Sequence, residues 1–272
     1  MNLMSAGAPD ADYFRDSTVV ITGGASGIGK ATAELFSAAH ADVVISDLDE
    51  QALELADRGI ENCTAIRGDV SRWDDCLRLA AAVQAAGKPL RVIVNAAASF
   101  LAKGVDATPD DWDRCLAVNV KGTALVTTAL VGLMRSAGKG GAIVNIASVS
   151  GYIAQPDRWT YNATKGAILA LTRCQALDLA PDNIRVNSVS PGTIWTPELD
   201  RMTGHNRAEW GPLLGSHHML NRVGEPAEVA SAVLFLCGPG AGFITGADLL
   251  VDGGYVAMGH DRFTARPEWS SS

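Results

Sequence analysis

The sequence predicts an α/β protein with a doubly wound parallel sheet of about seven strands and helices on both faces. Short runs rich in Val and Ile alternate with Ala- and Leu-rich stretches of helical length. Nearly all positions in these runs are apolar, as in strands that are buried on both faces. The first run is followed directly by a glycine-rich loop and then by a helical stretch.

The predicted strands cover residues 18–22, 42–47, 64–67, 90–95, 141–147, 184–188 and 248–251. The predicted helices cover residues 31–39, 50–58, 73–86, 109–134, 161–179 and 225–237. Thr108 with Asp111 three residues later predicts a helix start, and Pro226 suits a first helical turn. Gly87 and Gly138 suit helix ends.

A length of 272 residues fits one large α/β domain about as well as two small ones, and we expect one domain at residues 17–256. Residues 1–16 lack an apolar core segment, so we expect a disordered arm there and no signal peptide. Residues 193–222 form an unusually long connection of mixed composition, which we expect to cover a substrate. Residues 257–272 form a polar tail.

The net charge of -8 and the pI near 5.1 argue against a nucleic-acid partner, because phosphate backbones are bound by clustered Lys and Arg. The five cysteines are scattered and form no Cys-x-x-Cys pair, which favours a reducing cytoplasm and no zinc ribbon. We found no run of apolar residues long enough for a membrane span. His217 and His218 are adjacent and have no further ligand spacing, so no metal site is expected.

The glycine-rich loop predicts a dinucleotide site. Gly23, Gly27 and Gly29 follow the first strand and lead into a helix at Lys30. Backbone amides and the helix N-terminus then face a pyrophosphate with no side chain in the way, which is the Rossmann-type arrangement.

Asp47 favours NAD over NADP. It ends the second strand eighteen residues after Gly29, where a carboxylate accepts hydrogen bonds from the adenosine ribose and repels a 2′-phosphate. No Arg or Lys lies in the glycine loop or just after Asp47. The alternative is that Asp47 caps the next helix, for which Asp49 is also available.

Tyr161 and Lys165 are one helical turn apart and form the candidate catalytic pair. A tyrosine is a poor base near neutral pH unless a nearby cation favours the phenolate, and Lys165 is placed to supply that cation. Tyr161 would take the proton of an alcohol or return it to a ketone. Ser148 follows a predicted strand and would hydrogen-bond the same substrate oxygen.

These residues resemble the short-chain dehydrogenase/reductase family of the single-domain type over residues 17–256. The motifs that carry the resemblance are Thr22-Gly-x-x-x-Gly-x-Gly29, Asp69-Val70, Asn95-Ala-Ala, Asn119 in Val118-Asn-Val-Lys-Gly122, Ser148, Tyr161-x-x-x-Lys165 and Pro191-Gly192. The family's usual Asn-Asn-Ala-Gly run is Asn95-Ala-Ala-Ala98 in this chain.

The resemblance implies a catalytic group of Asn119, Ser148, Tyr161 and Lys165, with Asn119 in a water-linked proton relay to Lys165. It implies a cofactor site of Gly23, Ser26, Gly27, Ile28, Gly29, Asp47, Asp69, Val70, Asn95, Tyr161, Lys165, Ile194 and Thr196. The alternative for Asn95 and Asn119 is a buried amide that ties backbone segments together. The resemblance also implies a homotetramer, or a homodimer, built on the long helices and the last strand.

For the substrate side we expect Ser148, Ser150, Tyr161 and Trp195, with Ile153, Trp159 and part of residues 198–219. This mix suits a cyclic alcohol, a polyol or sugar, or a hydroxylated ring. The alternatives are an NADPH-dependent carbonyl or 3-ketoacyl reductase and a protein that binds NAD without turnover. Enoyl reductases fit poorly, because their Tyr and Lys are typically more than four residues apart.

Overall fold

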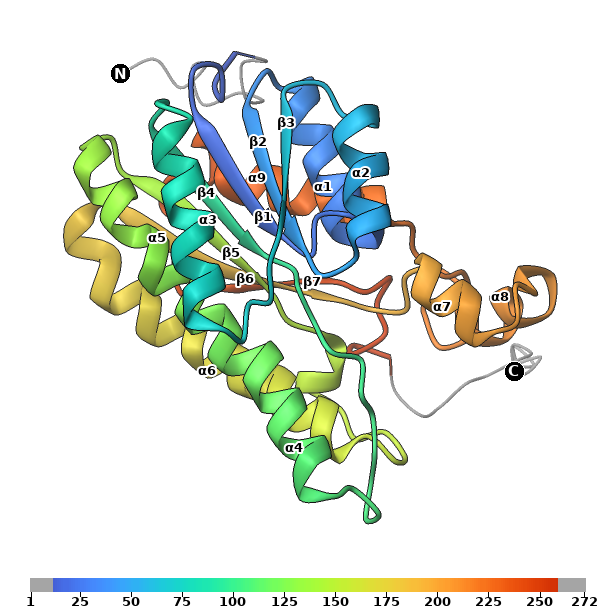
Figure 1. Ribbon diagram of the computed structural model, residues 1–272. Helices are drawn as coiled ribbons and strands as arrows, with labels where there is room; N and C mark the ends of the chain where they lie inside the picture. Colours follow the sequence, from blue (N-terminus) through green and yellow to red (C-terminus); the bar gives the residue numbers. More distant parts are fainter. Residues whose placement is uncertain (1–11, 259–272) are drawn as a thin grey trace, which may run out of the picture.

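In the computed structural model, which describes residues 12–258, one parallel sheet runs through the molecule and helices cover both of its faces (Figure 1). The strand order is β3-β2-β1-β4-β5-β6-β7. The strands are β1 (Thr18–Thr22), β2 (Asp42–Asp47), β3 (Cys63–Arg67), β4 (Leu90–Asn95), β5 (Gly141–Ile146), β6 (Ile184–Pro191) and β7 (Asp248–Val251). Each pair of neighbouring strands is parallel, which confirms the predicted fold class.

The helices divide into two layers because successive side chains of a strand point to opposite faces. Val19 and Ile21 of β1 belong to a cluster with helices α1 (Gly27–Ala38), α2 (Glu50–Gly59) and α9 (Pro226–Cys237). Val20 belongs to a second cluster with α3 (Trp73–Ala85), α5 (Thr123–Ala137) and α6 (Trp159–Leu179). Both faces of the sheet are therefore buried beneath helices, as the apolar strands predict.

The long helix expected at residues 109–134 is interrupted by a π-helical turn. The chain forms α4 (Pro109–Leu116), then the π-helix Ala117–Gly122, then α5. The apolar pattern does not reveal this turn, because the helix continues on both sides of it. The whole segment Pro109–Ala137 is long and apolar enough to cross a membrane by composition alone. Val126, Leu130 and Met134 lie in the core against the sheet, which accounts for much of that composition.

The helix ends follow the predicted capping residues. Thr108 and Asp111 form a reciprocal capping box at the start of α4, and Gly138 ends α5 in the left-handed region with φ 63°. Helix α1 begins at Gly27, earlier than expected, because the glycine loop itself forms its first turn. The connection at residues 193–222 contains two short helices, α7 (Pro197–Met202) and α8 (Arg207–Gly215).

The expected disordered arm is wrong at its C-terminal end. Phe14 is 1% exposed and packs edge-on against Phe36 of α1 with ring centroids 4.9 Å apart. Tyr13 stacks edge-on against Phe14. Phe14 therefore lies in the core just before the first strand, and Tyr13 packs against that core while partly buried. The rest of the arm, residues 1–11, and most of the predicted tail, residues 259–272, lie outside the described part of the chain.

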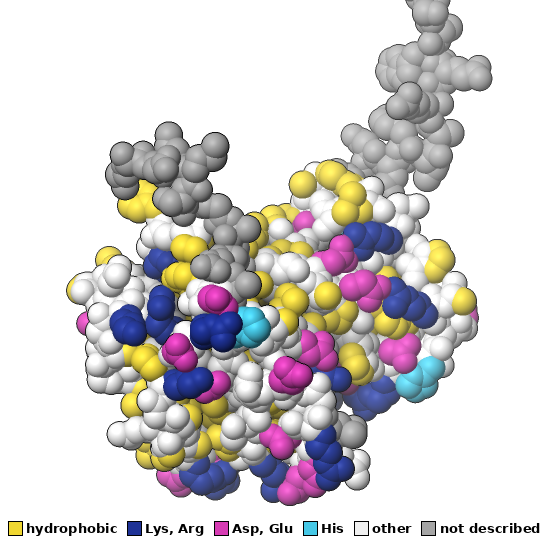
Figure 2. Space-filling model, turned by 90° about the horizontal axis from the view of Figure 1, so that it is seen from above, with side chains coloured by type: hydrophobic (Ala, Val, Ile, Leu, Met, Phe, Trp, Pro, Cys, Tyr) yellow, Lys and Arg dark blue, Asp and Glu magenta, His cyan; other side chains and the backbone are white. Residues whose placement is uncertain are grey.

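Charged side chains are mixed on the face of the molecule that Figure 2 shows. Lys and Arg side chains alternate there with Asp and Glu, and apolar side chains lie between them. The described residues on this face form no extended basic surface of the kind that binds a nucleic-acid backbone.

We predict that Phe14→Ala lowers the free energy of unfolding by about 3–5 kcal/mol, because the substitution leaves a cavity between the N-terminal segment and α1. Phe100→Ala is the matched control, since Phe100 is 53% exposed, and it should cost less than about 1 kcal/mol. Urea unfolding followed by circular dichroism measures both. Equal losses in the two variants would contradict the anchoring role of Phe14.

Candidate active site

A cleft of about 670 Å³ opens at the carboxyl ends of the strands, where the strand order reverses between β1 and β4. Ligands bind doubly wound sheets at this switch point. The cleft brings together most of the predicted site residues. They are Gly23, Ser26, Gly27, Ile28, Gly29, Asp47, Asp69, Val70, Ser148, Ser150, Tyr161, Lys165, Ile194 and Thr196.

The glycine loop is closed so tightly that its first and last glycines have no room for a side chain. A Cβ atom on Gly29 would lie 2.0 Å from the Gly23 carbonyl oxygen, and one on Gly23 would lie 2.8 Å from the Ala97 backbone. Ser26, the N-cap of α1, makes no capping hydrogen bond through its side chain. The amides at the start of α1 therefore lie bare at the cleft, which fits the pyrophosphate of a dinucleotide.

Asp47 lies at the adenosine end of the cleft and is oriented by backbone amides. Its Oδ2 accepts a hydrogen bond from the Ala25 amide at 3.2 Å, and its Oδ1 accepts one from the Leu48 amide at 2.8 Å. Asp49, not Asp47, caps α2, because its side chain accepts from the Ala52 amide. The capping alternative for Asp47 is therefore wrong.

Three carboxylates and two cations line the cleft. Asp47 ends β2, Asp69 follows β3 and Glu198 lies in α7, while Arg158 precedes α6 and Lys165 lies within it. These two are the cations among the described residues that line the cleft.

Tyr161 is held in its neutral form in this state of the protein. The side chain is 7% exposed, and burial raises its pKa to about 12, against the opposing effects of a hydrogen bond with Ser148 and the nearby charge of Arg158. Phe100 stacks on the Tyr161 ring with centroids 5.9 Å apart. A protonated phenol at neutral pH is the form that donates a proton.

Lys165 does not act directly on the Tyr161 hydroxyl in this state. Its Nζ donates a 2.7 Å hydrogen bond to the Ile146 carbonyl at the end of β5 and lies 5.6 Å from the centre of the Tyr161 ring. The side chain is 3% exposed, and burial lowers its pKa to about 8. We expected Lys165 to lower the pKa of Tyr161, and this effect is absent here. Burial is the largest cause of the pKa shift of both side chains.

Ser148 is oriented toward the cleft by its neighbour. Its Oγ accepts a 3.1 Å hydrogen bond from the Ser150 amide, and its hydroxyl group also hydrogen-bonds the Tyr161 side chain. The Ser150 hydroxyl donates to the Gln155 side chain at 2.6 Å. Tyr161, Lys165 and Ser148 can thus present two hydroxyl groups and one ammonium group to a small polar substrate.

Asn119 lies behind the cleft, inside the π-helical turn. Its amide nitrogen donates to the Ser99 carbonyl at 3.1 Å and to the Thr164 hydroxyl at 2.9 Å, and its oxygen accepts from the Ser99 amide at 2.7 Å. The side chain therefore fixes the loop after β4 to α6, as the structural alternative expects. A role in a proton relay stays a prediction.

Two predicted site residues besides Asn119 do not line the cleft. Asn95 is 4% exposed and donates to the Asn145 side chain at 2.9 Å, so its amide links β4 to β5 beneath the cofactor loop. The Trp195 indole donates to Asp200 at 3.2 Å and is covered by the Arg207 guanidinium, 5.1 Å from the ring centre. Both side chains have partners inside the fold, and their roles toward a cofactor or a substrate stay predictions.

Met202, Leu214 and His217 line the cleft and belong to the segment 198–219 that was expected on the substrate side. The sequence pattern did not single out four further lining residues, which are Phe100, Gln155, Arg158 and Tyr255. His217, also in the cleft, stacks on Tyr255 with centroids 5.8 Å apart. The four come from three segments far apart in the sequence, after β4, before α6 and after β7, so no spacing along the chain could have joined them.

Oxidoreductases that use a nicotinamide cofactor are the class that this fold and cleft define. Residues 23–256 match the family model described as enoyl-(acyl carrier protein) reductase. The chain belongs to the short-chain dehydrogenase/reductase family. Members of this family bind nicotinamide cofactors.

Three relatives show the range of activities among similar proteins. The chain is 38% identical over 250 residues to a cyclopentanol dehydrogenase of Comamonas sp., covering 89% of this chain and 98% of the relative. It is 35% identical to an NAD-dependent glycerol dehydrogenase of Listeria innocua (91% and 97% covered). It is 33% identical to an NADP-dependent (R)-specific alcohol dehydrogenase of Lentilactobacillus kefiri (91% and 99% covered).

We predict that Lys165→Met stabilises the protein at pH 7 by about 1–2 kcal/mol, because it removes a charge whose burial is unfavourable. In the wild type, the unfolded chain binds more protons than the folded chain between the folded pKa of about 8 and the unfolded value of 10.5. Wild-type stability therefore rises with pH in that window, and the gap to the variant closes.

Urea unfolding at pH 7 and at pH 9.5 measures this gap. Lys30→Met is the control, since Lys30 is exposed and pairs with Glu34 on α1, and it should show little change. A Lys165→Met variant less stable than the wild type at pH 7 would refute the account of the buried charge.

Proposed function

We propose that the protein is an NAD-dependent oxidoreductase that interconverts a secondary alcohol and a ketone. The observation that carries this proposal is the meeting of Tyr161, Lys165 and Ser148 with the bare N-terminus of α1 in one cleft. Neither part alone would indicate hydride transfer, because glycine loops and Tyr–Lys pairs also occur in proteins without this activity.

The chain's own residues would manage the proton and the substrate oxygen. The nicotinamide supplies the hydride acceptor or donor when it is bound. In reduction, the neutral Tyr161 phenol donates its proton to the ketone oxygen, and in oxidation it takes the proton of the alcohol. Ser148 donates a hydrogen bond to the same oxygen and stabilises the charge that develops there.

NAD is the proposed cofactor because Asp47, at the end of β2, and Asp69, after β3, line the cleft together with the glycine loop, where the adenosine ribose would lie. Like charges would repel a 2′-phosphate at that position. The relatives include one NAD-dependent and one NADP-dependent enzyme, so the preference has to come from the cleft itself.

The proposed substrates are a cyclic alcohol, a polyol or sugar, or a hydroxylated ring. Phe100, Met202 and Leu214 supply an apolar wall, and Gln155 and His217 supply polar groups that could bind further hydroxyls. The similarity to a cyclopentanol dehydrogenase and a glycerol dehydrogenase supports this range. A carbonyl or 3-ketoacyl reductase that uses NADPH is the alternative, and it would require the Asp47 argument to fail.

A cytoplasmic homotetramer is the assembly that we propose by family resemblance. Exposed apolar side chains such as Leu116 and Leu177 on the long helices and Phe243 before the last strand are compatible with subunit contacts. Sedimentation of a monomer would contradict it.

The first experiment follows absorbance at 340 nm with NAD or NADP and a panel of cyclic alcohols, polyols, sugars and cyclic diols at mildly alkaline pH. We expect reduction of NAD with one chemical group. Tyr161→Phe should bind NAD like the wild type and lose at least about 100-fold in kcat, the scale of a general acid or base. Unchanged turnover in Tyr161→Phe would refute the catalytic assignment.

The cofactor preference can be tested separately at Asp47. We predict that Asp47→Ser reduces the ratio of NAD to NADP affinity by roughly tenfold to a hundredfold, because the repulsion of a 2′-phosphate is removed. Asp49→Ser is the matched control. It removes the same charge two residues away but lies outside the cleft residues. Serine is also a good N-cap residue, so the variant should keep the α2 cap and leave the ratio unchanged. An equal change in both variants would mean that net charge alone sets the preference.

A further inference from the structure

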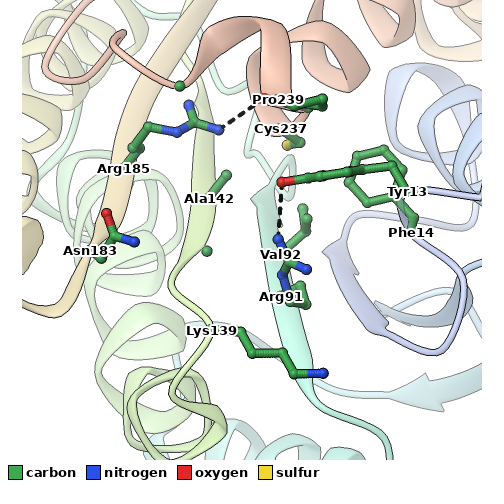
Figure 3. Close-up of a pocket in the computed structure, with 13 residues that line it drawn as sticks. Tyr13, Phe14, Arg91, Val92, Lys139, Ala142, Asn183, Arg185, Cys237 and Pro239 are labelled. Carbon is green, nitrogen blue, oxygen red and sulfur yellow. Dashed lines mark hydrogen bonds between the residues drawn. The ribbon is translucent and has the colours of Figure 1, made fainter. Parts of the chain in front are cut away.

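A second pocket lies at the amino-terminal ends of β4, β5 and β6, whereas the cleft lies at the carboxyl ends of the strands (Figure 3). Its volume is about 180 Å³. The wall is formed by Tyr13 and Phe14, by the first residues of β4, by the loop before β5, by the turn into β6 and by the end of α9. The proposed reaction makes no use of it.

Positive charge is concentrated in this pocket. Arg91, Lys139 and Arg185 line it, and none of the described residues that line it is Asp or Glu. Figure 3 shows Arg185 on one side, Tyr13 with Arg91 on the other, and Lys139 at one end. This is unexpected in a chain of net charge -8, because three cations in one small space repel each other unless something compensates them.

The backbone compensates only one of the three cations well. Arg185 donates to the carbonyl groups of Leu236 at 2.7 Å and of Gly238 at 3.3 Å, at the end of α9. These bonds fix its guanidinium as a permanent part of the wall.

The positive charge of Arg91 is compensated less well by its neighbours than that of Arg185. Its Nη2 donates to the Tyr13 hydroxyl at 3.0 Å, and its guanidinium lies 5.1 Å from the Tyr13 ring centre. Its Nε is buried and has no hydrogen-bond partner among the described residues. A guanidinium held mainly by a neutral phenol keeps most of its charge available to an anion.

Lys139 is exposed and makes no ion pair with a described carboxylate. The remaining wall carries no competing charge. Burial raises the pKa of the Cys237 thiol to about 12, so this side chain stays neutral. Val92 and Ala142 supply apolar surface.

We propose that this pocket binds a small oxyanion with at least two negative charges, held between the Arg91 guanidinium and the Lys139 ammonium group. The volume is too small for a nucleotide and is close to that of a cavity that holds one six-membered ring. Phosphate and short polycarboxylates share the required chemistry. Tyr13, which belongs to the segment before β1, closes the pocket beside the anion.

Calorimetric titration of the full chain with inorganic phosphate, and separately with citrate, tests the proposal at constant ionic strength in chloride. Each titration is done with and without saturating NAD, because the glycine loop is a second place where phosphate could bind. The variants are Arg91→Gln and Lys139→Gln. Arg58→Gln on α2 is the control, since Arg58 is 77% exposed in its side chain and outside the pocket.

We expect saturable binding of at least one anion to the wild type and to Arg58→Gln, unaffected by NAD. Arg91→Gln should weaken it roughly tenfold or more, and Lys139→Gln several-fold, since each removes a charge-assisted contact. Lys139→Gln alters an exposed side chain, so it reports on the pocket even if Arg91→Gln is poorly folded. Binding of phosphate alone or of citrate alone assigns the ligand class.

Three results would overturn the proposal. The first is no saturable binding of either anion. The second is equal affinity in the wild type and in Lys139→Gln and Arg91→Gln. The third is binding that NAD abolishes, which would place the anion in the cleft.

Discussion

A sheet in which all seven strands run parallel has to be covered on both faces, because each connection between its strands crosses one face or the other. This constraint sets the two apolar clusters, one with α1, α2 and α9 and one with α3, α5 and α6. In a parallel sheet the carboxyl ends of all strands also lie on one side, and the amino-terminal ends lie on the other. The cleft and the basic pocket therefore lie at opposite ends of the same strands β4, β5 and β6.

Burial of charged and polar groups is the second determinant of the site. Lys165 and Tyr161 are both almost fully enclosed, and each is pushed toward its neutral form. The Lys165 amine on α6 donates a hydrogen bond to the Ile146 carbonyl at the end of β5, and this bond fixes the position of the side chain. Such an arrangement is unfavourable for folding in itself, and the packing of the two clusters offsets it.

The strands, the parallel sheet and the position of Asp47 and of the Tyr161 and Lys165 pair follow from local patterns, and the sequence was sufficient for them. Asn95 and Trp195 could not be placed in the same way, because their partners Asn145 and Arg207 are known only after the chain has folded. Arg91 and Lys139 are nearly fifty residues apart in the sequence, and only the parallel order of β4 and β5 makes them neighbours.

The π-helical turn at Ala117–Gly122 rotates the side-chain faces of α4 relative to those of α5. In one continuous α-helix the two segments would keep the same helical periodicity. One residue corresponds to about 100° of rotation in an α-helix, and a π turn holds one more residue than an α turn. Helix α4 packs against α6, and α5 packs against β4 and α3. A chain shorter by one residue in this turn would rotate one of these faces out of contact. The extra residue of the π turn thus sets which face of α4 meets α6 while α5 keeps its contact with the sheet, and Asn119 lies within that turn.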